Sequence, residues 1–288
     1  TRKESSAASD VYKRQNTPFK IVIHEAASLL CVNWYKRDIE NILVEKDIFV
    51  CFNQRDIELL KLSFKNIKNF EILIPARVPY TESIKKVNYP VSNLIYYGRI
   101  SSQKNIHYLL WLIWFVCSKT NKKPKLYIIG AEDHLGAPHV GIFCKDYLQV
   151  LKTLAQELDI LESVVFRDFM TLEQIIELCE EENLTYTSMS THSDENFGIA
   201  PWEMKINNIP TLLSDWGGYQ DIERYFSKNP NSIGVYGSDL GPFIDFEELL
   251  HSYLNDDSNK SSSFLPSKVN EDLLNECDSN KPLESTKY

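Results

Sequence analysis

Short apolar runs alternate with longer amphipathic segments along the first part of the chain. The apolar runs predict buried strands at residues 19–24, 47–53 and 70–75. The segments between them, residues 25–46 and 54–66, predict helices. Two successive β-α-β steps predict a parallel sheet, because parallel neighbours need a crossover connection between them.

A second and longer series of the same kind follows residues 76–88, a polar stretch with prolines nearby that predicts a linker. Its apolar runs predict strands at residues 93–97, 125–129, 164–169, 184–189 and 211–214. Helices are predicted at residues 105–119, 146–158 and 171–182, after Glu195, and at residues 219–225. This regular alternation predicts a complete doubly wound domain. The fold class is therefore α/β, with two units and a ligand-binding cleft beyond the carboxyl ends of their strands.

The composition is that of a packed globular protein. The chain has 288 residues, of which 43% are hydrophobic and 12% aromatic, so it can bury one large core or two small ones. Its net charge of -9 disfavours a general nucleic-acid or anionic-membrane binder, although local basic sites are compatible with it. The most apolar run, residues 108–117, is shorter than the roughly 18 residues of a membrane span. We expect a cytoplasmic protein.

The cysteines show no spacing typical of a zinc site or a redox pair. No CxxC and no Cys/His cluster occurs, and most of the thiols stand in apolar stretches, as buried thiols do. Reduced thiols are expected rather than disulfides. The six positions are Cys31, Cys51, Cys117, Cys144, Cys179 and Cys277.

Both ends of the chain are polar and lack hydrophobic periodicity. Residues 1–15 resemble translated sequencing-adapter sequence and are interpreted as a non-native leader, with a disordered native leader as the alternative. Residues 255–288 are rich in Ser, Asn, Asp, Glu and Lys and are expected to form a mostly mobile tail, with a short helix at residues 269–274.

The first candidate site is the loop that follows the strand predicted at residues 93–97. Gly98 lets the backbone turn and approach a ligand, and Arg99 and Lys104 stand on the same loop before a helix. Two cations beside a helix N-terminus suit a diphosphate. The alternative is that both are ordinary solvated surface charges.

The second candidate site is residues 190–203 (STHSDENFGIAPWE), between a strand and a helix. Glu195 stands before the helix, Gly198 permits close backbone approach, and Glu203 lies inside the helix. Carboxylates accept paired hydrogen bonds from vicinal hydroxyls, so the two glutamates suit the two sugar ends of a nucleotide sugar. The alternative is that Glu195 favours the helix dipole and Glu203 is a solvated helix residue.

The third candidate is the turn Trp216-Gly217-Gly218, which follows the strand at residues 211–214. Paired glycines before a helix allow an anion to approach the backbone, and an ordinary β-α turn is the alternative.

Taken in order, these segments resemble glycosyl transferases group 1, the retaining glycosyltransferases with two Rossmann-like domains (the GT-B architecture). Residues 98–105 (GRISSQKN) are similar to the family's Gly-Arg-Leu-Ser-x-x-Lys-Gly loop. Residues 195–203 (ENFGIAPWE) match its motif of two glutamates separated by seven residues, including the inner Phe-Gly. Residues 209–222 (IPTLLSDWGGYQDI) resemble the stretch that follows, and residues 164–170 (VVFRDFM) stand where the family has a loop near the base.

The resemblance implies a role for each residue of these segments. Arg99 and Lys104 would neutralise the donor diphosphate and the charge on the departing nucleoside diphosphate, Glu195 would hold hexose hydroxyls, and Glu203 would hold the ribose. His24, at the end of the first predicted strand, would face the donor sugar, with a structural role as its alternative. The further residues implied to bind the donor are Gly98, Phe169, Met170, Asn196, Phe197, Gly198, Ile199, Gly217 and Gly218.

The implied reaction is the transfer of a hexose from a nucleoside diphosphate sugar with retention at the anomeric carbon, in glycan biosynthesis. No metal or other cofactor is expected, because Arg99 and Lys104 replace it and no DxD-type pair ends a strand. The implied partners are the nucleotide-sugar donor and a glycan, lipid or small-molecule acceptor. Nucleic acid and a transmembrane segment are not expected, and peripheral membrane contact is left open.

Within this architecture, residues 16–85 are expected to form a truncated N-terminal Rossmann-like domain on the acceptor side, and residues 90–254 a complete C-terminal nucleotide-sugar-binding domain. A fragment that binds the nucleotide sugar without catalysis is therefore the alternative function. The sequence also departs from the family pattern: Asp168, Asn105 and Asn208 replace glycine, and Asp221 replaces glutamate.

Overall fold

The computed structural model describes residues 18–24, 26–31, 39–73, 93–133, 144–191, 195–225, 232–233, 235–238 and 241–254. The chain divides into two compact units, Thr1–Arg77 with Ser193–Phe197, and Val78–His192 with Gly198–Tyr288. Each unit has its own parallel sheet and its own hydrophobic core. The predicted α/β class is therefore confirmed. The predicted leader, linker and tail lie outside the described residues.

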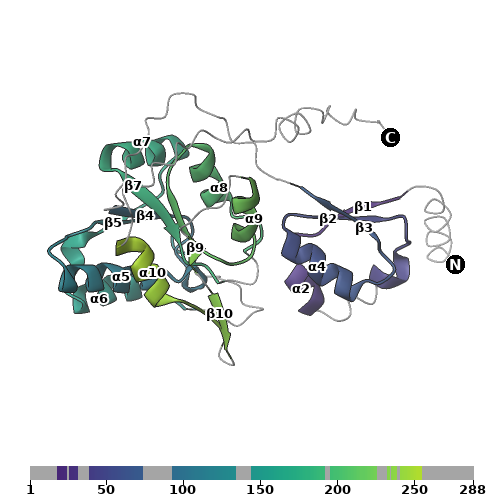
Figure 1. The fold of residues 1–288 in the computed structure, drawn as a ribbon, viewed down its shortest axis with the longest axis horizontal. Helices are drawn as coiled ribbons and strands as arrows, with labels where there is room; N and C mark the ends of the chain where they lie inside the picture. Colours follow the sequence, from purple (N-terminus) through teal and green to yellow (C-terminus); the bar gives the residue numbers. More distant parts are fainter. Residues whose placement is uncertain are drawn as a thin grey trace. The chain divides into compact units, whose positions relative to one another are not determined.

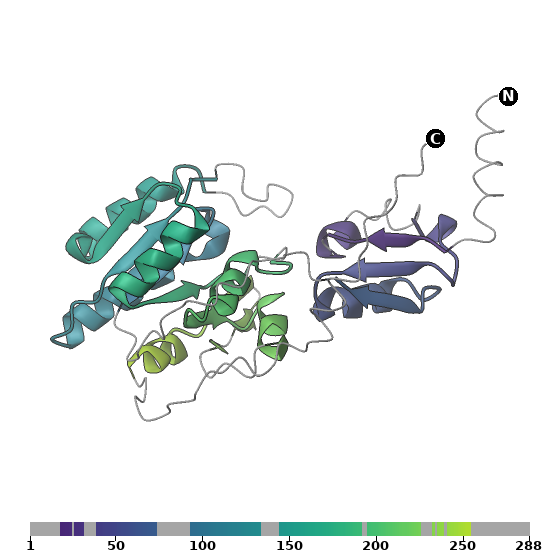
Figure 2. The same cartoon turned by 90° about the horizontal axis from the view of Figure 1, so that it is seen from above.

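The first unit is built on a three-stranded parallel sheet. Strands β1 (Lys20–Val22), β2 (Ile48–Cys51) and β3 (Asn69–Ile72) pair in the order β1-β2-β3 and lie side by side (Figure 2). Helices α2 (Ala26–Cys31) and α4 (Gln54–Ser63) contact each other on one side of this sheet (Figure 1). The buried core between these layers comprises Ile23, Ala26, Leu43, Phe49, Cys51, Ile57, Leu60, Phe64 and Ile67.

The helix predicted over residues 25–46 is wrong in its last part, because residues 43–46 are not helical. The buried carboxylate of Asp47 explains the difference. Its Oδ2 accepts the backbone N–H of Val44 at 2.9 Å, and its Oδ1 accepts that of Phe19 at 2.9 Å. A side chain that takes a backbone N–H in this way offers the chain an alternative to the helical hydrogen bond.

The second unit contains a six-stranded sheet in which every neighbouring pair is parallel. The strand order is β6-β5-β4-β7-β8-β9. The bounds are β4 (Asn93–Tyr97), β5 (Leu126–Ile129), β6 (Val164–Arg167), β7 (Leu184–Ser188), β8 (Thr211–Ser214) and β9 (Ser232–Ile233). The first five of these confirm the predicted strands of this unit to within two residues at each end.

Helices cover both faces of this sheet. Figure 1 shows α5 (Ile106–Lys119), α6 (Tyr147–Glu157) and α10 (Phe246–Leu254) on one side, with α7 (Leu172–Glu182), α8 (Ile199–Ile206) and α9 (Tyr219–Tyr225) on the other. Short 3₁₀ turns lie at Ser102–Lys104 and Leu161–Ser163. Strand β9, helix α10, and the antiparallel pair β10 (Val235–Ser238) and β11 (Gly241–Ile244) extend the unit beyond the predicted elements.

The central strands of the second unit are buried along most of their length, which explains their apolar sequences. Strand β7 (LTYTS) departs from this pattern, because it places Thr185 and Thr187 in the core. No helix in the described part of the chain is long and apolar enough to cross a membrane.

Replacing Thr187 by valine is expected to stabilise the protein. Its buried Oγ1 has no hydrogen-bond partner among the described residues, so removing the hydroxyl should raise the free energy of unfolding by ~1 kcal/mol. Thr171→Val is a matched control of opposite sign. The Thr171 hydroxyl accepts the N–H of Gln174 in a capping box at the start of α7, and its loss should cost ~1 kcal/mol. Urea unfolding measures both, and destabilisation by Thr187→Val would contradict the unpaired hydroxyl.

Candidate functional site

The strand order of the second unit places a topological switch point between β4 and β7. From β4 the chain passes through α5 to β5 and through α6 to β6, always moving outward on one side. Strand β7 then pairs with the other side of β4, and β8 and β9 follow outward from it. Open parallel sheets bind ligands beyond the carboxyl ends of their strands at such a point. The segments that follow β4 and β7 are the first two candidate sites predicted from the sequence.

The loop after β4 is held against the loop after β5 by backbone contacts. Gly98 N donates to Ile129 O at 3.0 Å, and Ile100 N donates to Ala131 O at 2.9 Å. Gly130 has a φ of +146°, and a Cβ built on it would lie 1.9 Å from the carbonyl oxygen of Gly98. The path of the Gly98 loop therefore depends on the absence of a side chain at position 130.

Arg99 projects from this loop and pairs with an acidic residue from the neighbouring loop. Its Nη1 lies 2.6 Å from Oδ2 of Asp133, and the Arg99 side chain remains 58% exposed while that of Asp133 is 17% exposed. Tyr96 OH donates to the carbonyl oxygen of Arg99 at 2.6 Å and supports its backbone. Asp133 thus orients the guanidinium, most of which remains accessible to an anion.

The end of the same loop is tied to the segment after β7. Asn105 Nδ2 donates to Met189 O at 3.0 Å and to Thr191 Oγ1 at 2.9 Å. Ser190 Oγ donates to Gln103 O at 3.4 Å. These bonds place Lys104, between Gln103 and Asn105, beside the carboxyl end of β7.

Gly198 lies at the start of α8 in a left-handed conformation with a φ of +75°. A Cβ there would lie 2.6 Å from Cε1 of Tyr219, whose ring is buried and whose hydroxyl lies 2.8 Å from Ser188 Oγ. Tyr219 thereby joins the start of α9 to the end of β7 and occupies the space that a side chain at position 198 would need. Gly198 was expected to let a ligand come close to the backbone. On the side where a Cβ would stand, the group that comes close is the Tyr219 ring.

Glu203, the second glutamate of the predicted pair, contacts the last residue of β4. Tyr97 OH donates hydrogen bonds to Glu203 Oε2 and to the carbonyl oxygen of Ala200. Burial raises the pKa of Glu203, and the hydrogen bond from Tyr97 partly offsets this. Burial also raises the pKa of Tyr97, so the phenol stays protonated and donates. The β4–α8 contact therefore orients the Glu203 carboxylate at the switch point.

Glu195, Asn196 and Phe197 are grouped with the first unit, although they follow directly on a segment of the second. Glu195 and Phe197 are buried, and Asn53 Nδ2 donates to both the carbonyl oxygen and Oδ1 of Asn196 at 2.8 Å. Asn196 Nδ2 donates to the carbonyl oxygen of His24. The predicted residues His24 and Asn196 are thus in contact within one unit.

His24 lies two residues beyond the end of β1, rather than at the last position of the strand as predicted. Its ring packs against Phe52 with 5.2 Å between the ring centroids, and the residue is exposed. Its backbone carbonyl, rather than its ring, carries the hydrogen bond to Asn196.

The remaining predicted residues follow other strands of the second unit, beyond the carboxyl ends of those strands. Phe169, which is 79% exposed, and Met170 follow β6, the outermost strand on one side. Gly217 and Gly218 follow β8 and are buried. Ile199 opens α8 and is 53% exposed.

A family model described as glycosyl transferases group 1 matches residues 84–229, which is more than half of the chain. The protein belongs to this family. The match spans the switch point and every predicted site residue except His24. Among curated proteins, no match is found.

Three solved structures share the fold of this family member. Anabaena HepE, in complex with UDP and glucose, is 13% identical with a TM-score of 0.53, over 91% of this chain and 72% of HepE. WaaG, a glycosyltransferase involved in lipopolysaccharide biosynthesis, is 14% identical with a TM-score of 0.54, over 85% of this chain and 61% of WaaG. The pneumococcal O-GlcNAc transferase GtfA, in complex with UDP and GlcNAc, is 16% identical with a TM-score of 0.52.

At these identities the likeness shows the fold alone, which is the GT-B-like α/β architecture predicted from the sequence. The match with GtfA covers 77% of this chain but only 39% of GtfA. The chain therefore spans between about two fifths and three quarters of the length of these three proteins.

Two departures of this glycosyltransferase-family chain from the family pattern have a backbone explanation. Asn105 and Asn208 stand where glycine is common, and both adopt a left-handed conformation, with φ of +51° and +54°. Asparagine tolerates this region better than other side-chain-bearing residues. At position 105 the amide additionally bonds to Met189 and Thr191, so the asparagine keeps the turn and adds a tether.

Sequence reasoning missed several residues that hold the site in place. Gln103 lies within the first candidate loop, Tyr97 is the last residue of the strand before it, and Asp133 lies in the loop after β5, which was not a candidate. Nothing in their spacing indicated their partners. Gln103 is the most informative, because its buried Nε2 has no hydrogen-bond partner within the described ranges. A buried donor of this kind costs about 1–3 kcal/mol, so a ligand or a water is expected to satisfy it.

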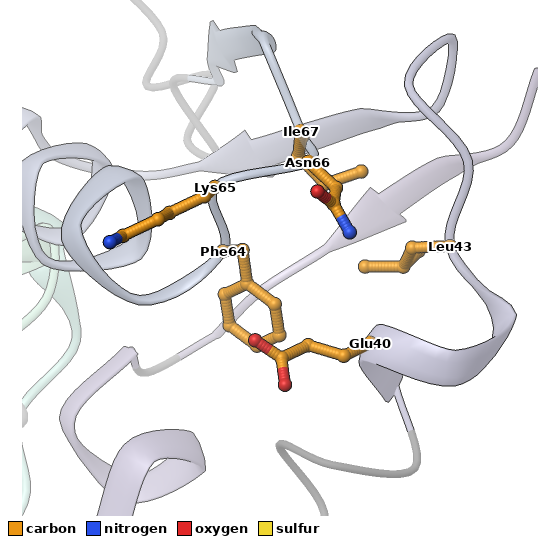
Figure 3. Close-up of a pocket in the computed structure, with 6 residues that line it drawn as sticks. All are labelled: Glu40, Leu43, Phe64, Lys65, Asn66 and Ile67. Atoms are coloured by element: carbon orange, nitrogen blue, oxygen red, sulfur yellow. The ribbon is translucent and has the colours of Figure 1, made fainter.

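A small pocket in the first unit is lined by none of the predicted site residues. Figure 3 shows its lining, Glu40, Leu43, Phe64, Lys65, Asn66 and Ile67. Its cavity volume is about 10 Å³, roughly the room that one water molecule needs and far below the ~300 Å³ at which small-molecule sites begin. Three of its six residues belong to the hydrophobic core, so we assign it no function.

The described residues include no group of three or more His, Cys, Asp or Glu side chains that could hold a metal ion. Cys51, Cys117, Cys144 and Cys179 are free thiols. Burial raises the pKa of the Cys51 and Cys179 thiols to about 12, which keeps them protonated and unreactive.

Proposed function

We propose that the protein transfers a hexose from a nucleoside diphosphate sugar to a glycan, lipid or small-molecule acceptor, with retention at the anomeric carbon. The observation that carries this proposal is the loop Gly98–Lys104, which places two cations at the switch point of a sheet in a glycosyltransferase family. HepE and GtfA, which share the fold, were solved with UDP and a sugar, and this supports a nucleotide-sugar donor here.

In this proposal Arg99 and Lys104 bind the donor diphosphate. Charge accumulates on the phosphate oxygens as the bond to the anomeric carbon breaks, and fixed cations stabilise it. Asp133 holds the Arg99 guanidinium at 2.6 Å, so the cation is oriented before the donor binds. Gly98 and Gly130 together allow the backbone of the loop to follow its close path. We propose that these groups act without a metal cofactor.

The two glutamates are proposed to accept hydrogen bonds from the two sugars of the donor, the ribose and the hexose. Glu203 accepts ribose hydroxyls while Tyr97 occupies one of its oxygens, which leaves the other oxygen for the ligand. Glu195 accepts hexose hydroxyls, and the backbone from Asn196 to Ile199 contacts phosphate or sugar. The base is proposed to lie near Phe169 and Met170. An acceptor hydroxyl attacks the anomeric carbon on the face from which the nucleoside diphosphate departs.

Replacing Arg99 by alanine is expected to weaken the binding of a nucleoside diphosphate by about 10- to 100-fold, because a charged hydrogen bond contributes about 1.5–3 kcal/mol. Binding of the bare nucleoside should change by no more than about twofold, because it lacks the diphosphate. Calorimetric titration with UDP, GDP and ADP, with their sugars, and with the nucleosides measures both effects and identifies the base.

Lys122→Ala is the matched control for Arg99→Ala, because Lys122 is an exposed cation in the loop before β5, at the opposite edge of the sheet. It should leave the affinities for nucleoside diphosphates, their sugars and nucleosides unchanged. If Arg99→Ala weakens the binding of nucleoside diphosphate and of nucleoside equally, Arg99 does not bind the phosphates. Donor binding without donor hydrolysis or transfer would restrict this chain to nucleotide-sugar binding.

A further inference from the structure

Helix α5 exposes large aromatic side chains on its outward face. Trp111 and Trp114 are 40% and 41% exposed, and helical periodicity places both on the same face as His107 and the exposed Ser118. The opposite face is fully buried against the sheet and the neighbouring helices through residues such as Leu109 and Ile113. A helix on a protein surface normally carries charged residues on its outer face, and this one carries rings.

The rings of His107, Tyr108 and Trp111 on α5 pack against one another. The Trp111 ring lies 5.4 Å from the rings of both His107 and Tyr108, measured between centroids. His107 Nδ1 lies 2.9 Å from the hydroxyl of Tyr147 on α6, and burial lowers the pKa of His107 to about 4. The imidazole is therefore uncharged at neutral pH. These contacts form a continuous ring cluster that is ordered before any partner binds.

Lysines follow this ring cluster at the carboxyl end of α5. Lys119, Lys122, Lys123 and Lys125 are all exposed, within seven consecutive residues. The sequence contains no aspartate or glutamate between Glu82 and Glu132, although the whole chain has a net charge of -9. We call the rings of His107, Tyr108, Trp111 and Trp114 and these four lysines together the α5 patch. It combines an apolar surface with a locally positive one in an otherwise acidic protein.

The acidic residues of the helix α10, which packs on α5, lie away from the lysines. Tyr253, in the last turn of α10, lies close enough to Cys117 of α5 for their side chains to interact, so the two helix ends meet there. Glu247 and Glu248 occupy the first turn of α10, about 8–9 Å along its axis from Tyr253.

Glu162, which is next to Ser163 in the chain, lies on a different side of α5 from the tryptophans. Ser163 Oγ lies 3.8 Å from Cys117 Sγ. Cys117 is partly buried and is turned by roughly 120° from Trp111 around the helix axis.

Two other carboxylates lie nearer to the rings: Asp146 directly precedes Tyr147, which contacts His107, and Glu132 accepts the backbone N–H of Leu148 at 2.9 Å. They lie near the first turn of α5, about four turns from the lysines at its carboxyl end.

We propose that the α5 patch docks this protein onto an anionic lipid bilayer, a partner that the proposed transfer reaction does not require. Tryptophan and tyrosine rings favour the headgroup region, and each lysine near the surface adds attraction to anionic lipid. Charge decides against a second copy of the chain as the partner, because a symmetric contact would bring the same lysines together. Helix α5 has 14 residues and lies on the bilayer rather than across it.

Sedimentation with lipid vesicles tests the proposal on the whole chain. Binding is expected to vesicles of phosphatidylglycerol and phosphatidylcholine, to be weak on vesicles of phosphatidylcholine alone, and to fall as salt is added. Lys122→Gln with Lys123→Gln should reduce the partition coefficient roughly 30-fold. Trp111→Ser with Trp114→Ser should reduce it on the order of tenfold or more.

Two control variants carry the same chemical changes elsewhere on the surface. Lys61→Gln with Lys65→Gln removes two exposed lysines of the first unit, and Leu62→Ser removes a side chain that is 77% exposed. Both should bind anionic vesicles as the unaltered protein does, and circular dichroism should show all variants folded. The proposal is overturned if the unaltered chain does not bind anionic vesicles, or if the α5 patch variants bind them as the unaltered chain does. It is also overturned if the tryptophan variant loses self-association rather than lipid binding.

Discussion

Replacing Gly130 by alanine is expected to destabilise the second unit by more than ~4 kcal/mol, a size of effect that few single substitutions reach. The new Cβ would lie 1.9 Å from the carbonyl oxygen of Gly98, and the φ of +146° is one that side-chain-bearing residues rarely adopt. Because both obstacles are in the backbone, no side-chain rotation relieves them. Folded proteins are stable by only about 5–15 kcal/mol, so much of the molecule should be unfolded at moderate temperature.

Thermal and urea unfolding, followed by near-ultraviolet circular dichroism, measure this effect. Ala131→Ser is the matched control, because it adds one atom at the next position, which is exposed, and should change stability by less than ~0.5 kcal/mol. If Gly130→Ala and Ala131→Ser have the same unfolding midpoint, the Gly98 and Gly130 loops do not approach each other as closely as described. Any variant that remains folded should also have a displaced Arg99 and bind nucleoside diphosphates weakly.

Replacing Glu195 by alanine is expected to lower sugar transfer by about 10²–10³-fold, the size typical of losing one oriented polar contact in an active site. Under the proposed function this carboxylate positions the hexose, and a misplaced anomeric carbon cannot react. The backbone at this position should stay in place, because Asn53 holds the adjacent Asn196 through two hydrogen bonds of 2.8 Å. The affinity for the nucleoside diphosphate alone should change little.

A labelled donor sugar and a panel of acceptors measure the transfer rate, and calorimetry measures nucleotide affinity. Glu195→Gln keeps the shape of the side chain but removes its charge, so comparing it with Glu195→Ala separates the two contributions to transfer. Glu58→Ala, on the exposed side of α4, is the control for loss of a glutamate and should leave transfer unchanged. Near-normal turnover by Glu195→Ala would contradict its role as the sugar-positioning residue.

Much of the architecture was predictable because buried parallel strands have a distinctive sequence. Strands β4, β5 and β8 (NLIYY, LYII and TLLS) are buried on both faces, so their apolar runs were identified to within one residue. The prediction was less accurate where a single side chain changed the local backbone. Asp47 ends the helical segment before residue 43 by accepting the N–H of Val44, and periodicity contains no information about that bond.

The candidate site was predictable as a set of segments but not as a set of contacts. The order of the loops at residues 98–105, 195–203 and 216–218 indicated the family, which the match over residues 84–229 confirmed. The specific roles given to Arg99, Lys104, Glu195 and Glu203 stay predictions. Asn53 illustrates what was missed, because an asparagine before a helix indicates only a cap. Here it caps α4 through Asp56 and also holds Asn196, 143 residues away.

The sequence by itself determined the α/β class, most of the succession of strands and helices, and the resemblance to the family, because these depend on local periodicity and on motifs within one segment. Only the tertiary structure decided that β7 pairs with β4, and so brought Lys104 beside the end of β7. It likewise decided that Tyr97 holds Glu203 and that Gly130 must lack a side chain. Contacts between residues so far apart in sequence arise from strand order and packing, which local hydrophobic patterns do not specify.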